Sequence, residues 1–325
     1  MGDKRDFYIQ VFSTLRTDSN KNRWLAKTNF KAPHKPFLLL SILDLIASES
    51  ITRNFIEPSF ELAETFTGYR SKVMPLGTSA SMSYPFYHLQ SSGFWHLVGQ
   101  LGMLHKHGYT ISSVKRLREL YLGARLDEDL FLFLLMEDFR EEVRETLVMK
   151  YFAQEVRSII TEQTSINYDA SRYSQELMNA AELLPAYSAS EKPAIFNQAR
   201  DQGFRKAIVQ LYEHRCALCG IRMLTPEGHT IVEAAHIVPW CECKNDKPQN
   251  GMALCRLCHW SFDEGLMGVG QDYEVLVSLS VRQENNFPGH METLSGRGIF
   301  KPQDRKFWPD QSNFAIHRKN TFRRR

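Results

Sequence analysis

The 325-residue chain has no apolar run long enough to cross a bilayer, because its two most apolar stretches cover only residues 37–46 and 130–136. Its first ten residues, MGDKRDFYIQ, lack the apolar core and cleavage site of a secretory signal. Internal repeats and low-complexity tracts are also absent from the sequence. Apolar residues make up 43% of the chain, which is enough for packed cores. We therefore expect a globular cytoplasmic protein, and the length favours two domains.

Cysteine is scarce, but four of the six cysteines form two CxxC pairs, Cys216/Cys219 and Cys255/Cys258. In a reducing compartment, pairs with this spacing are metal ligands more often than disulfides. Four thiolates complete a tetrahedral zinc, so the pairs predict a structural zinc site, with Cys241 and Cys243 left outside it. A zinc ribbon that binds nucleic acid without cutting it would use the same four ligands, and the cysteines alone leave that alternative open.

Net charge is low, at +3, but it is unevenly distributed. Residues 1–36 contain eight Lys or Arg and three Asp or Glu, and residues 301–325 contain eight and two. Residues 127–145 reverse the balance, with eight acidic and two basic side chains. Basic patches near both ends suit a polyanion such as DNA, although the last three arginines alone are equally consistent with a solvated tail.

The first 155 residues have a mainly helical pattern. Residues 36–47 (PFLLLSILDLIA) predict an apolar helix that starts at Pro36, and residues 126–152 predict one long helix or two short ones. Small and polar residues dominate from 161 to 192, which predicts a linker that contains one short helix at 175–183.

A second unit is expected to start near Pro193 with a helix over 197–213. Residues 230–238 (TIVEAAHIV) then predict a strand, residues 240–250 a polar loop and residues 252–264 a helix. The first CxxC pair falls on a turn that Gly220 closes. Strand, loop and helix in this order are what a compact metal-binding nuclease domain needs.

Four further residues in this region have the chemistry for phosphodiester hydrolysis. An imidazole such as that of His236 can take a proton from water at neutral pH. The carboxamide of Asn250 can hold the loop and orient the His236 ring through its oxygen. His259 and Asp263 are four residues apart on the predicted helix, so both can bind one divalent cation.

Three motifs resemble the HNH endonuclease family: EAAHIVPW at 233–240, QNGMALC at 249–255 and LCHWSFDEG at 257–265. The resemblance covers about residues 196–280 and implies a ββα-metal fold. It implies that His236 is the general base, Asn250 the orienting residue, and His259 with Asp263 the ligands of a catalytic Mg²⁺ or Mn²⁺. Many members of the family have a metal-binding Asp or His where this chain has Ala235. Glu233, on the same strand face, is a candidate replacement ligand.

Two N-terminal segments, KAPHKPFLLL at 31–40 and YPFYHLQSSGFWHL at 84–97, resemble the sulfur-binding domain of restriction endonucleases that recognise phosphorothioate DNA. A phosphorothioate keeps the negative charge but exposes a larger, poorly hydrated sulfur atom. The resemblance implies apolar contact from Pro33, Tyr84 and Pro85, charge recognition by His34 and Lys35, and a pocket position for His88. This family tends toward Arg and a small residue where the chain has Lys35 and His88.

The sequence thus predicts an α+β protein with a DNA-recognition domain at 1–155, a linker at 156–195 and an HNH nuclease domain with a basic tail at 196–325. The predicted function is modification-dependent cleavage of double-stranded DNA in bacterial restriction or defence, with phosphorothioate as the mark and a homodimer or two sequential nicks to cut both strands. One alternative is an HNH restriction enzyme for unmodified sequence or for a base modification. Another is a zinc-dependent DNA-binding protein without catalysis.

Overall fold

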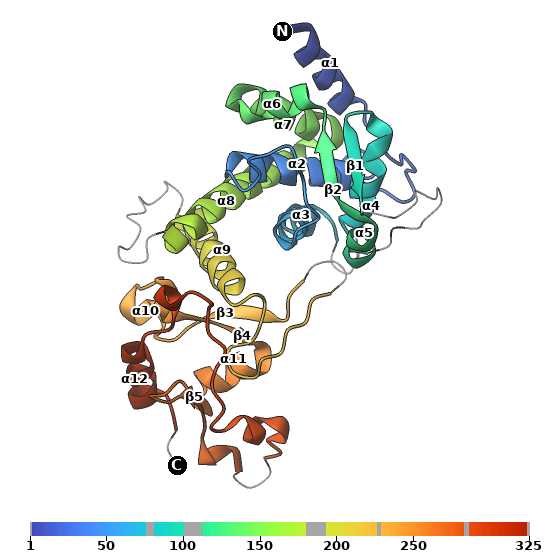
Figure 1. Ribbon diagram of the computed structural model, residues 1–325. Coiled ribbons are helices and arrows are strands. Elements are labelled where there is room, and N and C mark those ends of the chain that lie inside the picture. Colours follow the sequence, from blue (N-terminus) through green and yellow to red (C-terminus); the bar gives the residue numbers. More distant parts are fainter. Residues whose placement is uncertain are drawn as a thin grey trace. The chain divides into compact units, whose positions relative to one another are not determined.

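The chain divides into two compact units, Met1–Tyr168 with Thr225–His229, and Asp169–Leu224 with Thr230–Arg325. The computed structural model describes residues 2–75, 81–100, 111, 113–179, 193–225, 229–282 and 286–323. Helices predominate in it and the strands form antiparallel pairs, which confirms the α+β prediction (Figure 1). Among the described helices, none has both the length and the apolarity that a bilayer crossing requires.

Among its described residues, the first unit is helical apart from one strand pair, β1 with β2. Its elements in chain order are α1 (Gly2–Ser13), η1 (Ala26–Thr28), α2 (His34–Ala47), α3 (Phe60–Val73), α4 (Ser83–His88), η2 (Leu89–Ser92), β1 (Trp95–Gly99), α5 (Val114–Leu120), β2 (Tyr121–Leu126), α6 (Glu128–Leu135), α7 (Glu137–Tyr151) and the first part of α8 (Gln154–Asn179). The stretch 126–152 therefore contains two helices, separated by Met136 in an extended conformation.

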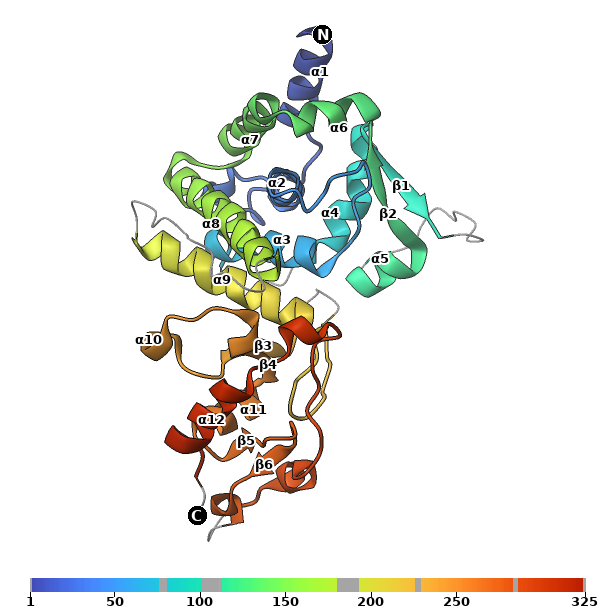
Figure 2. The same ribbon diagram turned by 60° about the vertical axis from the view of Figure 1, so that its left-hand side comes forward.

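Helix α2 is the centre of the first unit (Figure 2). Its residues from Lys35 to Ile46 are all buried, as expected for a helix that is apolar on every side. Asp44 is the buried carboxylate of this helix, and Arg144 of α7 donates to it at 2.7 Å. Tyr69 of α3 and Asn167 of α8 also donate to Asp44. One carboxylate thus ties α2 to α3, α7 and α8, so the polar residue of this apolar helix specifies how the surrounding helices pack.

The polar segment predicted to be a linker is different in the structure. Instead of one short helix at 175–183, a single helix, α8, runs from Gln154 to Asn179. Buried residues recur along it every three or four positions, namely Val156, Ile160, Gln163, Ile166, Ala170, Tyr173 and Leu177. This spacing is that of an amphipathic helix, and small polar residues between these positions hide it in the composition. The remaining residues of the predicted linker, 180–192, lie outside the described residues.

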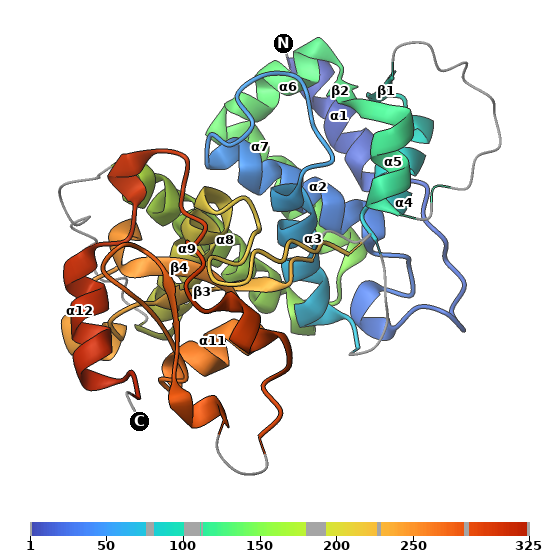
Figure 3. The ribbon, with the colours of Figure 1, turned by 60° about the horizontal axis from the view of Figure 1, so that its bottom comes forward.

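The second unit is built around the antiparallel pair of β3 and β4, with the register Val232↔Cys255 to His236↔Gly251. Its elements are α9 (Pro193–Leu211), β3 (Val232–His236), α10 (Trp240–Cys243), η3 (Pro248–Asn250), β4 (Gly251–Cys255), α11 (Arg256–Asp263), β5 (Met267–Val269), β6 (Val275–Val277), η4 (Leu279–Arg282), η5 (Gly289–Leu294), η6 (Arg305–Phe307) and α12 (Gln311–Asn320). Helices α9 and α11 both pack on this pair, which is therefore covered from two sides (Figures 2 and 3).

The stretch 252–264 is not one helix, as the sequence predicts, but strand β4 followed by helix α11. Every residue of β4 is buried, so the strand lacks the apolar-polar alternation that would distinguish it from a buried helix. The change from strand to helix falls between Cys255 and Arg256, within the second CxxC pair.

The C-terminal segment completes the core of the second unit. Phe314 of α12 is fully buried, and the ring of His317 stacks on Phe262 of α11 with centroids 3.7 Å apart. Further upstream, the backbone N–H of Phe300 donates to the carbonyl of Ala217 at 2.8 Å. The tail is therefore part of the same hydrophobic core as the hairpin.

Candidate active site and metal centre

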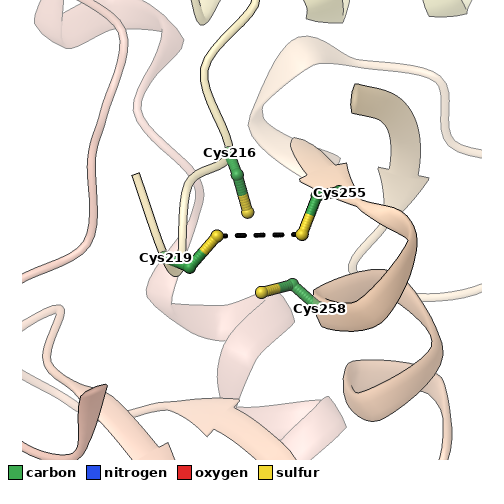
Figure 4. A group of neighbouring side chains, drawn as sticks. All are labelled: Cys216, Cys219, Cys255 and Cys258. Carbon is green, nitrogen blue, oxygen red and sulfur yellow. Dashed lines mark hydrogen bonds between the residues drawn. The ribbon is translucent and has the colours of Figure 1, made fainter. Parts of the chain in front are cut away.

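The four cysteines of the CxxC pairs converge on one point in the second unit. Their sulfur atoms all lie within 4.8 Å of one another, and Cys219 and Cys255 are 3.7 Å apart (Figure 4). Cys216, Cys255 and Cys258 are buried, whereas Cys241 and Cys243 are exposed and outside the group. Four converging sulfur donors fit a tetrahedral metal ion. Four sulfur ligands already fill the four positions of such an ion, which indicates a structural metal site.

Two tight local structures bring the cysteines together. In the first, Gly220 donates to the carbonyl of Cys216 at 2.9 Å and has a left-handed φ of +79°. A Cβ atom at this position would lie 2.4 Å from the ring of Phe300, so both the turn and its packing require glycine. In the second, Cys255 ends β4 and precedes the first residue of α11, which carries Cys258. The strand-to-helix junction therefore sets the spacing of the second pair.

Hydrogen bonding among the four sulfur atoms perturbs their acidity. The neighbouring thiols, with Cys219 the largest influence on Cys216, lower the pKa of Cys216 and Cys255. The same contacts raise the pKa of Cys219 and Cys258. Thiols this close do not all ionise unless positive charge is placed among them, because their negative charges repel. The donor set therefore suits a cation that binds thiolates.

His236 is held at the end of β3. Its ring stacks on Phe204 of α9, with centroids 4.0 Å apart and an interplanar angle of 6°. Its Nε2 lies 2.7 Å from Oδ1 of Asp246, a buried carboxylate that the sequence interpretation did not single out. Oδ2 of Asp246 accepts from Tyr173 at 2.8 Å and from Arg200 at 3.2 Å. The ring plane of His236 is thus fixed by an aromatic face and by one carboxylate.

Asn250 is fully buried and holds the loop that precedes it. Its Oδ1 accepts from the backbone N–H of Val238 at 3.0 Å, and its Nδ2 donates to the carbonyls of Val238 and Asn245 at 3.0 and 2.9 Å. The sequence interpretation gave its oxygen direct contact with the His236 ring. In the structure that oxygen is bonded to Val238, and Asp246 contacts the ring instead.

His259 lies between two carboxylates. Its Nε2 is 3.5 Å from Oδ2 of Asp263, one turn along α11, and its Nδ1 is 3.7 Å from Oε2 of Glu233 on β3. His259 and Asp263 therefore present two donors on one side of the ring, as their spacing predicts. Glu233 faces the opposite ring nitrogen. That separation is beyond hydrogen-bond distance, and Oε1 of Glu233 accepts from Nε of Arg256 at 3.4 Å.

The first unit contains a pocket of about 850 Å³ whose lining comes from two separate segments. His34 and Lys35 begin α2, while Tyr84, Pro85 and His88 belong to α4. The rings of Tyr84 and His88 are 4.2 Å apart. Arg16 and Trp24 contribute to the same lining. Pro33 is buried just ahead of α2 and does not line the pocket formed by the described residues.

Burial changes the charges in this pocket. It lowers the pKa of His34 to about 4, and Arg70 adds to the effect, which favours the neutral imidazole at pH 7. Burial, with a contribution from Arg16, lowers the pKa of Lys35 to about 8. Burial and nearby Lys35 also lower the pKa of His88. The charge of Lys35 therefore changes close to neutral pH. Its Nζ donates to Oγ of Ser91 at 3.3 Å.

A β-hairpin with a histidine at the end of its first strand, an asparagine before its second and a histidine on the following helix defines a ββα nuclease domain. Residues 216–270 match the sequence model of the HNH endonuclease family. The second unit therefore carries a domain of the HNH endonuclease type. The match begins at Cys216 and includes both CxxC pairs, which are part of the domain.

Comparisons of the whole chain with curated proteins and with solved structures give little beyond the family match. None of the curated proteins matches this chain. Among solved structures, the chain resembles one described as the modification-dependent TagI restriction endonuclease, with 19% sequence identity and a TM-score of 0.28. The alignment covers 44% of this chain and 42% of the other, so this chain spans less than half of that protein.

Proposed function

We propose that this protein is a bacterial restriction endonuclease that recognises phosphorothioate-modified double-stranded DNA through its first unit and cuts it with its HNH domain in the cytoplasm. The proposal that the first unit recognises DNA rests on one observation. A single pocket is lined by residues from two segments of the chain: His34, Lys35, Tyr84, Pro85 and His88. Apolar contact from Tyr84 and Pro85 beside cations such as Lys35 and Arg16 suits a negatively charged group with a large, poorly hydrated atom. The proposed domains are a DNA-recognition domain at 1–155, a linker at 156–195 and an HNH nuclease domain with a basic tail at 196–325.

His236 is the proposed general base for hydrolysis. It takes a proton from water, the water oxygen bonds to phosphorus, and the bond from phosphorus to the 3′ oxygen breaks. Asn250 holds the loop beside it. The proposed ligands of a catalytic Mg²⁺ or Mn²⁺ are His259 and Asp263, with Glu233, whose Oε2 is 3.7 Å from Nδ1 of His259, as the candidate additional ligand. When bound there, the cation supplies positive charge next to the leaving oxygen.

Zinc is the proposed occupant of the site of Cys216, Cys219, Cys255 and Cys258, because four converging sulfur donors favour a soft, four-coordinate ion. A homodimer is proposed for cutting both strands, with two sequential nicks as the alternative. Basic residues of the C-terminal tail, among them Arg305 and Lys306, are proposed to contact backbone phosphate.

The proposed function is tested with matched duplexes that differ by one phosphorothioate linkage, together with plasmid nicking in Mg²⁺ or Mn²⁺. We expect the sulfur-bearing duplex to bind about tenfold more tightly, equivalent to about 1.4 kcal/mol. Tyr84→Ala should remove most of this preference because Tyr84 lines the pocket, while Tyr168→Ala, an exposed tyrosine outside it, should keep it.

Equal binding of the two duplexes would reject phosphorothioate as the mark and favour an HNH enzyme for unmodified sequence or a base modification. Failure of the unchanged protein to nick DNA in either metal, while binding persists, would instead favour a zinc-dependent DNA-binding protein.

The pocket also predicts how DNA binding depends on pH. Because the pKa of Lys35 is about 8, the charged form that an anion requires is lost above that pH. Affinity should be constant below pH 7.5 and fall above pH 8 by up to about tenfold per pH unit, since one proton must be taken up on binding. Lys35→Met should bind more weakly and without this slope, which fluorescence anisotropy from pH 6.5 to 9.5 would measure.

Lys115→Met is the matched control, because Lys115 is an exposed lysine of α5 that does not line the pocket. It should keep the slope of the unchanged protein. An identical slope in Lys35→Met would show that Lys35 is not the titrating group.

A further inference from the structure

Asp246 is an unusual residue for the loop it occupies. The loop between α10 and η3 is polar in sequence, yet Asp246 is only 2% exposed. Its two oxygens have different partners. Oδ1 contacts Nε2 of His236, whereas Oδ2 accepts from Tyr173 of α8 and Arg200 of α9. A carboxylate is costly to bury, so three partners from three elements indicate that this one has a specific task.

We propose that Asp246 is a positioning residue for the general base: its Oδ1 accepts the hydrogen on Nε2 of His236 and leaves Nδ1 as the nitrogen that takes the proton from water. This inference rests on the proposed role of His236. Nδ1 has no hydrogen bond to any residue in the described part of the chain, and the His236 side chain is 20% exposed. Stacking on Phe204 fixes the ring plane, and Asp246 fixes which nitrogen carries hydrogen.

Asn250 acts on the base through this carboxylate. Its Nδ2 donates to the carbonyl of Asn245, and its backbone N–H donates to the carbonyl of Lys247 at 2.8 Å. These bonds hold the two residues on either side of Asp246. The asparagine of the HNH motif therefore places Asp246, and Asp246 places the ring.

The partners of Oδ2 determine which way an amide at position 246 would be oriented. Arg200 can only donate, so the atom that faces it must be an acceptor. In an Asp246→Asn variant the amide oxygen must therefore face Arg200, which turns the NH₂ group toward His236. An NH₂ group donates, so Nε2 would become the acceptor and the ring hydrogen would move to Nδ1. In this variant Nδ1 therefore carries the hydrogen, and it can no longer accept a proton from water.

The direct test is the tautomer of His236 in the full-length protein. Nitrogen NMR of histidine-labelled protein, recorded without DNA at a pH where imidazoles are neutral, should show hydrogen on Nε2 in the unchanged protein and on Nδ1 in Asp246→Asn. Hydrogen on Nδ1 in the unchanged protein would overturn the proposal, whether or not the variant folds. This readout needs no cleavage, so it stands apart from a failure of the proposed nuclease function.

Cleavage kinetics supply the second test. Asp246→Asn should lose about 10²-fold or more in kcat with little change in KM, because the wrong tautomer affects the chemical step and not DNA binding. Adding Arg200→Met removes the obligatory donor and lets the amide turn round, so the double variant should regain about tenfold over Asp246→Asn. No recovery, together with hydrogen on Nε2 in Asp246→Asn, would show that Asp246 is only structural.

Discussion

His236→Ala is expected to lower the cleavage rate by about 10³-fold, within the range that removing a general base gives, while DNA binding is unchanged. The reason is that His236 is the proposed general base and lies in the HNH domain, whereas the pocket proposed to recognise DNA lies in the first unit. Single-turnover cleavage at saturating enzyme measures the chemical step, and a binding titration without metal measures affinity.

His290→Ala is the matched control, because His290 is an exposed histidine of η5 in the same unit. It should cleave at the normal rate. Alanine at 236 also removes the stacking on Phe204, so a melting curve is needed to show that the unit remains folded. A folded His236→Ala protein that cleaves at the normal rate would mean that another group is the base.

Cys258→Ser is expected to prevent the second unit from folding. Cys258 is 1% exposed and lies among three other sulfur donors, and serine is a poor ligand for the proposed zinc. Structural zinc contributes about 10–16 kcal/mol in small zinc domains, which is as large as the whole stability of a typical domain, about 5–15 kcal/mol. Metal analysis should find one zinc per unchanged chain and none in the variant. Calorimetry should lose the transition of the second unit.

Cys241→Ser separates this effect from a general sensitivity to losing a cysteine. Cys241 is exposed and outside the group of four, so its replacement should leave both the metal content and the melting temperature as they are. A Cys258→Ser protein that binds zinc and melts normally would contradict a structural role for the site.

The proximity of the side chains in these motifs could be predicted from sequence because short-range spacing controls it. Cys216 and Cys219 share one turn and Cys255 and Cys258 one strand-to-helix junction, so each pair is close in space once the local structure forms. His259 and Asp263 are neighbours on one helix for the same reason. The gathering of Lys35 and Tyr84 in one pocket depended instead on a family resemblance, since no local rule joins positions so far apart.

Asp246 could not be found in this way. In sequence it is one charged residue in the polar run KNDKPQN, which is typical of an exposed loop. Its burial depends on Tyr173 and Arg200, which come from helices dozens of residues earlier in the chain. The helical part of the predicted linker was missed for a related reason, because Tyr173 and Leu177 are apolar anchors whose packing partners lie outside the local window.

Because the C-terminal segment packs closely on the hairpin, it must be included when the nuclease domain is transferred to another protein. The family match ends at residue 270, but Leu294, Ile299 and Phe314 belong to the same core as β3 and β4. Tyr173 and Leu177 of α8 belong to it as well. A cutting module joined to a different DNA-recognition protein would therefore need to extend from about residue 169 to 323, roughly three times the length that the motif suggests.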